Sequence, residues 1–211
     1  MPSLVATEEP CVASRGKSKP SAHTTKELSP ETWPDFEKLF AKHGGVQAGC
    51  WCMFYHRRRP LPPEFRGKER AAQNRRDKEA FVQQGRSHGI LVYAGEQPVG
   101  SCQFGPRDEL PRLDAGRIYR KLDLPVDAGK LWRITCFFVD RDYRHKGVAK
   151  VALLAALDAI RKKGGGVVEA YPATSRKTVG IWFGTVDMFE RERFRTVCAY
   201  GNSNVLMRRT I

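Results

Sequence analysis

Residues 139–149 (VDRDYRHKGVA) join an apolar stretch to a long amphipathic one through a basic turn that contains Gly147. The N-terminus of a helix offers unpaired backbone N–H groups and about half a positive charge, so it attracts anions. Arg144 and Lys146 add full charges and further donors. We therefore predict a site for a diphosphate here. The alternative is an ordinary strand–turn–helix whose basic residues face solvent.

Three residues of this turn, Arg144, Gly147 and Ala149, fit the pattern R/Q-x-x-G-x-G/A. The preceding Val-x-x-x-Tyr-Arg spacing, the apolar strand before it and the amphipathic helix after it fit as well. Together they resemble motif A of the GCN5-related N-acetyltransferase (GNAT) superfamily, over about residues 88–208. The resemblance implies that acetyl-coenzyme A (acetyl-CoA) is the cosubstrate. The implied acceptor is an amine on a small molecule, an aminoglycoside-like compound, a peptide or a protein N-terminus.

The resemblance also implies roles for individual residues. Backbone N–H groups of residues 144–149 would hold the diphosphate, and the backbone of Val139 would pair with pantetheine. The N–H of Phe137 would point at the thioester carbonyl and stabilise the oxyanion. The predicted cofactor-binding residues are Phe137, Val139, Arg144, His145, Lys146, Gly147, Val148 and Ala149.

Acyl transfer to an amine needs the amine unprotonated. An amine with a pKa of about 10 is almost fully charged at neutral pH, so we expect a general base. Many GNAT relatives place an acidic base on the strand before motif A, but residues 131–139 contain no Asp or Glu. We predict Glu169, in the stretch VVEAY, as the base, with an ion-paired structural role as the alternative. Asp187 and Glu190 are weaker candidates.

The last helix of the family often reads N-x-x-A-x-x-x-Y-x-x-x-G-F, and this chain departs from it. The positions of the Asn, Ala, Tyr and Gly are taken by Trp182, Thr185, Phe189 and Arg193. In such relatives the Tyr often protonates coenzyme A, so water or the Thr185 hydroxyl would have to replace it here. The departures keep a second hypothesis open, a GNAT-like protein that binds acyl-CoA without catalysis.

The elements that position these residues follow from periodicity and from Gly and Pro breakers. We expect helices at residues 64–84, 148–163 and 178–191, and one that buries Trp33, Phe36, Leu39 and Phe40. The helix at 148–163 should bury Val151, Leu154, Leu157 and Ile160. Strands are expected at residues 49–55, 90–94, 98–104, 131–139, 167–171, 195–200 and 205–208. Residues 105–130 should form a long loop that could cover a substrate cleft, to which Trp51, Trp132, Trp182 and Phe183 are candidate contributors.

The order of these elements predicts the fold class. The strand–helix–strand unit across residues 131–171 implies two parallel strands with a crossover helix. The resemblance adds that this pair splays apart to admit pantetheine. We therefore expect a mixed α/β (α+β) fold with a central, mostly antiparallel twisted sheet, one parallel splayed pair and flanking helices.

Length and composition bound the remaining possibilities. The 211 residues, 41% of them hydrophobic, favour one domain at 29–211 behind a disordered tail at 1–28. No apolar run is long enough for a transmembrane helix, and the N-terminus does not read as a secretory signal, so we expect a cytoplasmic protein with reduced thiols. No metal site is expected, because Cys50-Trp51-Cys52 lacks a second ligand pair.

The formal net charge of +14 makes polyanions the natural partners. A rival hypothesis is a basic nucleic-acid-binding module that uses Arg57-Arg58-Arg59 and residues 66–78. The sequence lacks a recognised nucleic-acid fold signature, so nucleic acid is not the expected partner. The resemblance leaves a homodimer open, since many relatives are dimers.

Overall fold

The computed structural model of the chain describes residues 23–122, 124, 129–174 and 182–211. In these ranges one seven-stranded sheet has the order β1-β2-β3-β4-β5-β7-β6. Its strands are β1 (Thr24–Glu27), β2 (His88–Ala94), β3 (Gln97–Pro106), β4 (Leu131–Val139), β5 (Val167–Ala170), β6 (Arg195–Tyr200) and β7 (Asn204–Thr210). The helices are α1 (Trp33–Ala41), α2 (Gly67–Gln83), α3 (Arg112–Ala115), α4 (Arg117–Arg120), α5 (Val148–Lys162) and α6 (Val186–Glu190), with 3₁₀ turns η1 (Arg107–Glu109) and η2 (Arg141–Tyr143).

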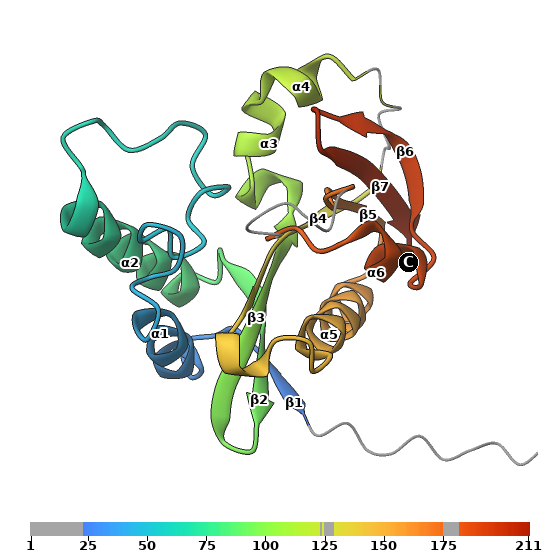
Figure 1. The fold of residues 1–211 in the computed structure, drawn as a ribbon. Helices are drawn as coiled ribbons and strands as arrows, with labels where there is room; N and C mark the ends of the chain where they lie inside the picture. Colours follow the sequence, from blue (N-terminus) through green and yellow to red (C-terminus); the bar gives the residue numbers. More distant parts are fainter. Residues whose placement is uncertain (1–22, 123, 125–128, 175–181) are drawn as a thin grey trace, which may run out of the picture.

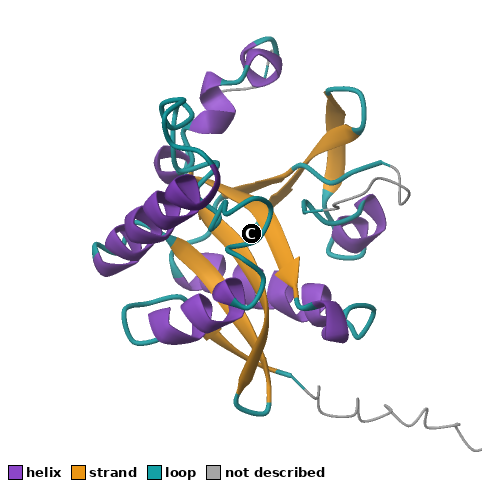
Figure 2. Cartoon of the chain, turned by 60° about the vertical axis from the view of Figure 1, so that its left-hand side comes forward, coloured by secondary structure: helices purple, strands orange, loops and turns teal. Residues whose placement is uncertain are grey.

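Helices cover both faces of this sheet (Figures 1 and 2). Successive side chains of a strand point to opposite faces. On β2, Ile90 and Val92 therefore pack with the side of α5, whereas Leu91 and Tyr93 pack with α1 and the end of α2. The expected mixed α/β class is confirmed. None of the helices in the described ranges combines the length and apolarity that a membrane span requires.

The parallel pair β4–β5 is short and then opens. Pairing runs only from Leu131↔Val167 to Ile134↔Ala170, while β4 continues to Val139. Every other neighbouring pair in the sheet is antiparallel. The predicted splayed pair is thus confirmed, and the second half of β4 lacks a β5 partner on that side.

The two amphipathic helices bury the faces that their sequences indicate, with one exception. In α1 the side chains of Trp33, Phe36, Leu39 and Phe40 are buried as predicted. In α5 Leu157 and Ile160 are buried as predicted and Val151 is half-buried. The prediction for Leu154 is wrong, because 42% of that residue is exposed. The buried face is instead centred on small residues, which let the helix approach the sheet closely, and its members are Val148, Ala152, Leu153, Ala156, Leu157, Ala159 and Ile160.

Residues 49–55 do not form the predicted strand. Gly49, Trp51 and Cys52 have φ angles of 73°, 50° and 54°, in the left-handed region, which extended chains do not use. The segment instead folds into consecutive turns. Its apolar side chains are buried because the turns pack Trp51 against Phe40, with ring centroids 5.9 Å apart.

Three other boundaries differ from the predictions. Strand β1 lies inside the predicted tail and pairs with β2, so the folded part begins before residue 29; residues 1–22 lie outside the described residues. The predicted loop at 105–130 contains η1, α3 and α4. Of the predicted helix at 178–191, only α6 is helical among the described residues, and 178–181 lie outside them.

Candidate functional site

The turn between β4 and α5 starts at a buried carboxylate. The Asp140 N–H donates to the Val99 carbonyl at 2.9 Å, and its side chain accepts from the Asp142 N–H at 3.1 Å and from Lys42 Nζ at 2.7 Å. Burial by itself raises the pKa of Asp140, but the hydrogen bonds from Lys42 and the Asp142 amide, with His43 Nε2 3.3 Å away, together lower it. Asp140 is therefore held ionised, and it fixes where the turn leaves the sheet.

The backbone conformation of this turn bears on where its main-chain amides can point. His145 and Gly147 both adopt left-handed φ angles, 61° and 79°, and alternation of conformation is what turns successive N–H groups toward one point. Within the described part of the chain, the amides of residues 145–150 have no protein acceptor. A Cβ at Gly147 would meet no atom within 4 Å. The turn and the start of α5 thus form an open anion cradle.

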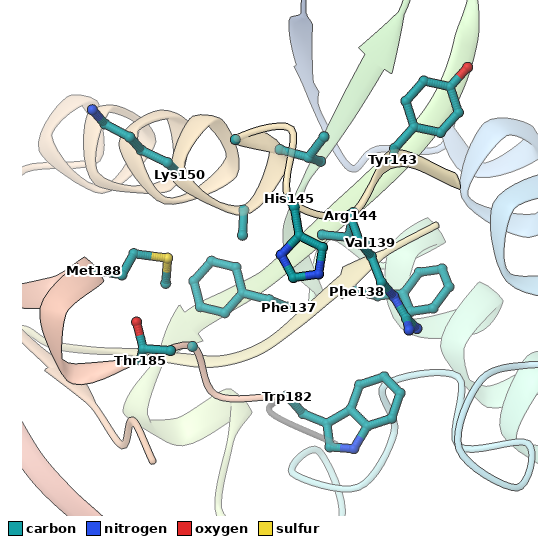
Figure 3. Close-up of a pocket in the computed structure, with 14 residues that line it drawn as sticks. Phe137, Phe138, Val139, Tyr143, Arg144, His145, Lys150, Trp182, Thr185 and Met188 are labelled. Carbon is teal, nitrogen blue, oxygen red and sulfur yellow. The ribbon is translucent and has the colours of Figure 1, made fainter. Parts of the chain in front are cut away.

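A cavity of about 480 Å³ lies between this cradle, the free half of β4 and the start of α6. Figure 3 shows the His145 ring and the Arg144 side chain directed into it, above Trp182, while the Tyr143 hydroxyl points away. Its lining residues are Phe137, Phe138, Val139, Tyr143, Arg144, His145, Gly147, Val148, Ala149, Lys150, Trp182, Gly184, Thr185 and Met188.

The structure brings together seven of the eight residues predicted to bind the cofactor. The exception is Lys146, which does not line the cavity and whose Nζ lies 5.1 Å from the centroid of the Tyr143 ring. Its backbone amide still belongs to the cradle. Arg144 and His145 therefore supply the side-chain donors on the cavity side.

The N–H of Phe137 is engaged by the protein itself. It donates to the carbonyl oxygen of Trp182 at 2.6 Å, on the side of β4 opposite to β3. Because strand N–H groups alternate in direction, the backbone of Val139 faces the same side. A pantetheine chain along β4 would have to exchange this hydrogen bond, so the predicted role of Phe137 requires a local rearrangement.

The positions that depart from the family pattern have distinct environments. Phe189 is fully buried, with its ring 6.1 Å from Phe137 and 5.0 Å from Phe194. Arg193 has a φ of 61°, a left-handed conformation that explains why glycine is common there. Thr185 precedes α6 and lines the cavity. Of these residues, Thr185 alone offers a hydroxyl to the cavity.

Glu169 lies in a buried ionic cluster. Its carboxylate accepts from the hydroxyls of Tyr119 at 3.0 Å and Tyr171 at 2.6 Å, from Arg133 Nε at 3.3 Å and from Arg208 at 2.8 Å. Arg133 is itself fully buried and also binds both oxygens of Asp114, at 2.7 and 3.0 Å. Four side chains thus occupy both oxygens of Glu169, which lines neither of the two cavities described in this section. This placement argues against the predicted role as general base.

A second cavity, of about 420 Å³, lies on the other side of Trp182, and the sequence interpretation missed most of it. Trp182 and Phe183, two of the four aromatic residues proposed for a substrate cleft, line it, whereas Trp51 and Trp132 are buried. Its lining residues are Gln47, Ala48, Cys50, Cys52, Met53, Phe54, Tyr55, Arg57, Pro60, Leu61, Arg70, Asn74, Gln103, Arg112, Thr135, Cys136, Trp182 and Phe183.

A buried polar network forms the floor of this second cavity. Gln103 Nε2 donates to the Cys52 carbonyl at 2.8 Å, and Thr135 Oγ1 donates to Gln103 Oε1 at 3.0 Å. Gln103 Nε2 also lies 2.9 Å from His56 Nε2. Burial, and then the charge of Lys78, hold the pKa of His56 well below its usual value. His56 is therefore neutral and adds no charge to the floor of this cavity.

Comparison with known proteins identifies a family and a fold that match this chain. Residues 51–178 match the sequence profile of the Acetyltransferase (GNAT) family. No curated protein matches the chain in sequence. Similar solved structures include a mosquito arylalkylamine N-acetyltransferase like 5b, with a TM-score of 0.57 at 12% identity over 90% of this chain and 100% of that one.

Two further structures share the fold. A putative acetyltransferase of the GNAT family from Desulfovibrio desulfuricans has a TM-score of 0.51 at 14% identity, over 89% of this chain and 98% of that one. A chain of the NatC complex bound to Gag peptide and CoA has a TM-score of 0.51 at 11% identity, over 90% and 98%. At these identities the likeness shows the fold alone.

Proposed function

This chain belongs to the acetyltransferase (GNAT) family, and we propose that it transfers the acetyl group of acetyl-CoA to the nitrogen of an amine. One observation carries the proposal: the amides of residues 145–150 have no acceptor in the described part of the chain, and five of these six residues line a cavity that runs along the half of β4 that β5 does not pair. An anion cradle beside a strand edge that β5 leaves open suits a ligand with a diphosphate at one end and an amide-containing chain at the other, once the Trp182 carbonyl is displaced from Phe137.

In this proposal the amides of residues 145–150 and the side chains of Arg144 and His145 hold the diphosphate. The backbone of Val139 hydrogen-bonds pantetheine amides in the manner of an added strand. The apolar side chains of Phe137 and Met188 exclude water from the thioester end of the cavity. The solved NatC complex, which contains CoA, supports the choice of this class of ligand.

The reaction forms a nitrogen–carbon bond and breaks a carbon–sulfur bond. The amine lone pair attacks the thioester carbon, negative charge develops on the carbonyl oxygen, and the nitrogen gives up its surplus proton to solvent water. The Phe137 N–H, released from Trp182, is the proposed donor to that oxygen. Coenzyme A then leaves as a thiolate. Because a free thiol has a pKa of about 8.5, the thiolate leaves readily, and protonation by water or Thr185 gives only modest help.

Calorimetric titration with acetyl-CoA, followed by thiol release with a panel of amines, tests the proposal. We expect binding, and amine-dependent thiol release whose acetylated product is identified by mass spectrometry. Arg144→Gln should weaken binding about tenfold, because it removes a charge-assisted hydrogen bond. Arg161→Gln removes the same charge from the far end of α5, outside the cavity, and should leave affinity unchanged.

Two results would favour the rival hypotheses. Binding of acetyl-CoA without thiol release across the panel would identify a non-catalytic acyl-CoA-binding protein. The observation behind this alternative is the buried Phe189, which stands where the family often has a tyrosine. Absence of acetyl-CoA binding, together with strongly salt-dependent binding of nucleic acid, would identify the basic binding module instead.

A further inference from the structure

We propose that the second cavity receives the acceptor and selects an apolar or aromatic amine that also carries a carboxylate, which Arg112 binds. This inference rests on the proposed acetyl transfer and adds a substrate class to it. It follows from the position of the cavity, its apolar walls and the charges along its lining.

The second cavity lies beside the first. The two cavities share Trp182, and β4 contributes to both: Phe137 and Val139 line the first, whereas Thr135 and Cys136 line the second. An amine in the second cavity therefore approaches the same stretch of β4 that would hold the thioester. A reacting pair must meet at van der Waals distance, and these two cavities are the described spaces that adjoin there.

The walls suit an apolar or aromatic body. The ring of Tyr55 lies edge-on to Phe54 at 4.9 Å and to Phe183 at 6.2 Å between centroids, and Met53 and Leu61 complete the apolar lining. A volume of about 420 Å³ lies in the usual range for small-molecule pockets, whose apolar walls hold a few placed polar groups. The cavity thus fits a compact molecule.

The charges suit an anion. Three arginines line the cavity, Arg57, Arg70 and Arg112, and none of its described lining residues is Asp or Glu. Arg57 is paired with Asp77 and Asn74, and Arg70 donates to the Ala48 carbonyl at 3.1 Å. The lining therefore has an uncompensated positive charge, which disfavours polycationic acceptors such as polyamines.

Arg112 is the residue placed to use that charge. Its guanidinium stacks on the Phe54 ring, 3.9 Å from the centroid, and it takes part in no ion pair among the described residues. Its backbone is held by a hydrogen bond from its N–H to the Tyr55 carbonyl at 3.3 Å. A stacked guanidinium is pre-oriented, and its fork of N–H donors matches a carboxylate in two parallel hydrogen bonds.

Three thiols line the cavity, Cys50, Cys52 and Cys136, and two of them do not offset this charge. Burial raises the pKa of the Cys50 thiol, and the hydrogen bond to Cys52 together with burial raises that of Cys136. Cys50 and Cys136 stay neutral at pH 7, whereas the hydrogen bond with Cys136 lowers the pKa of Cys52. No hydrogen bond joins Cys52 to Arg112 in the described part of the chain. The carboxylate of the ligand is therefore the natural partner of Arg112.

Steady-state acetylation of two matched pairs of amines tests the inference. Phenylalanine is compared with 2-phenylethylamine, and 4-(aminomethyl)benzoate with benzylamine; within a pair only the carboxylate differs. Spermidine represents polycations. We expect kcat/KM at least about tenfold higher for the carboxylate member of one pair than for its partner, because a charge-assisted hydrogen bond is gained, and no measurable use of spermidine.

The variant Arg112→Gln should lose that preference. We expect about a tenfold rise in KM for the carboxylate acceptor, little change for its uncharged partner, and unchanged calorimetric affinity for acetyl-CoA. Arg117→Gln removes the same charge from an exposed position on the neighbouring helix and should match the wild type. Equal use of both members of each pair, a preference for spermidine, or an Arg112→Gln variant that keeps the preference would overturn the inference. Acetyl-CoA binding and transfer to other amines would then still stand, whereas loss of acetyl-CoA binding would remove the proposed function itself.

Discussion

The backbone N–H of Phe137 donates to the carbonyl oxygen of Trp182 across 2.6 Å, and this contact closes the gap between the free half of β4 and the segment before α6. The Trp182 ring stacks nearly parallel to Phe138, 16° between planes. Trp182 lines both cavities. A ligand that binds along β4 must therefore move the Trp182 carbonyl and alter the surroundings of its indole.

Tryptophan fluorescence should report this movement. The chain has four tryptophans, and Trp33, Trp51 and Trp132 are at most 5% exposed. Titration with coenzyme A should change the emission, and Trp182→Phe should remove most of the change. Trp33→Phe, the control, should keep it. An undiminished response in the Trp182 variant would show that the ligand does not reach this segment.

Substitutions at Gly147 test whether the anion cradle binds the diphosphate of coenzyme A. The substitution Gly147→Trp puts a bulky side chain into the space that faces the amides and should weaken coenzyme A binding about a hundredfold, because two or more charge-assisted hydrogen bonds are lost. Gly147→Asn is the control, since asparagine tolerates the left-handed conformation and adds little bulk. Calorimetry gives both affinities, and circular dichroism checks the fold. Equal affinity in the tryptophan variant would place the diphosphate elsewhere.

Glu169→Gln separates a structural from a catalytic role. Removing the charge leaves Arg133 and Arg208 facing a neutral amide, so we expect the free energy of unfolding to fall by about 3 kcal/mol. The pH dependence of kcat/KM, measured on the folded variant, should keep its shape. Glu190→Gln, on the exposed side of α6, should leave stability unchanged. Loss of the acidic limb of the profile in Glu169→Gln would restore the general-base assignment.

The buried Asp140 should make stability depend on pH. Its pKa in the folded protein is lowered, so its stabilisation is complete above the unfolded pKa of about 3.9 and is lost as pH falls through the folded value. Asp140→Asn should lower the free energy of unfolding by about 2 kcal/mol at pH 7, and the difference from wild type should shrink toward pH 3. Urea titrations at pH 7 and pH 3 measure the free energy of unfolding of both proteins.

The control for Asp140→Asn is the matching substitution at Asp142. Asp142 has a side chain 69% exposed and lies 3.7 Å from Lys42. An exposed pair contributes little, so Asp142→Asn should change stability by less than about 1 kcal/mol at either pH. A difference for Asp140→Asn that stays constant with pH would contradict an ionised Asp140.

Substitution of Thr185 tests whether its hydroxyl protonates the departing thiolate. Because a thiolate leaves readily without prior protonation, Thr185→Val should lower kcat by less than about fivefold, with Thr185→Ser close to wild type. Rapid-quench measurement of the acetyl-transfer step provides the rate. A loss of about a hundredfold in the valine variant, restored by serine, would identify the Thr185 hydroxyl as the general acid.

The sequence by itself determined the features that depend on neighbours along the chain. The strand before Asp140, the Gly147 turn and the amphipathic helix after it are specified by local periodicity and by a residue that tolerates φ of 79°. The crossover between β4 and β5 followed from the order of these elements. Their local character is the reason that the turn and the helix after it could be predicted from the sequence, and cofactor binding by this turn stays a prediction.

The tertiary structure decided what depends on residues far apart in the chain. Glu169 looked like an isolated carboxylate in an apolar strand, yet the fold surrounds it with Tyr119, Arg133 and Arg208, up to 50 residues away. The second cavity likewise joins turns near residue 50 to Arg112 and Trp182. No local pattern encodes these contacts, because they form only when the sheet brings distant segments together. The same long-range contacts determine which carboxylates are ion-paired and which side chains line the second cavity.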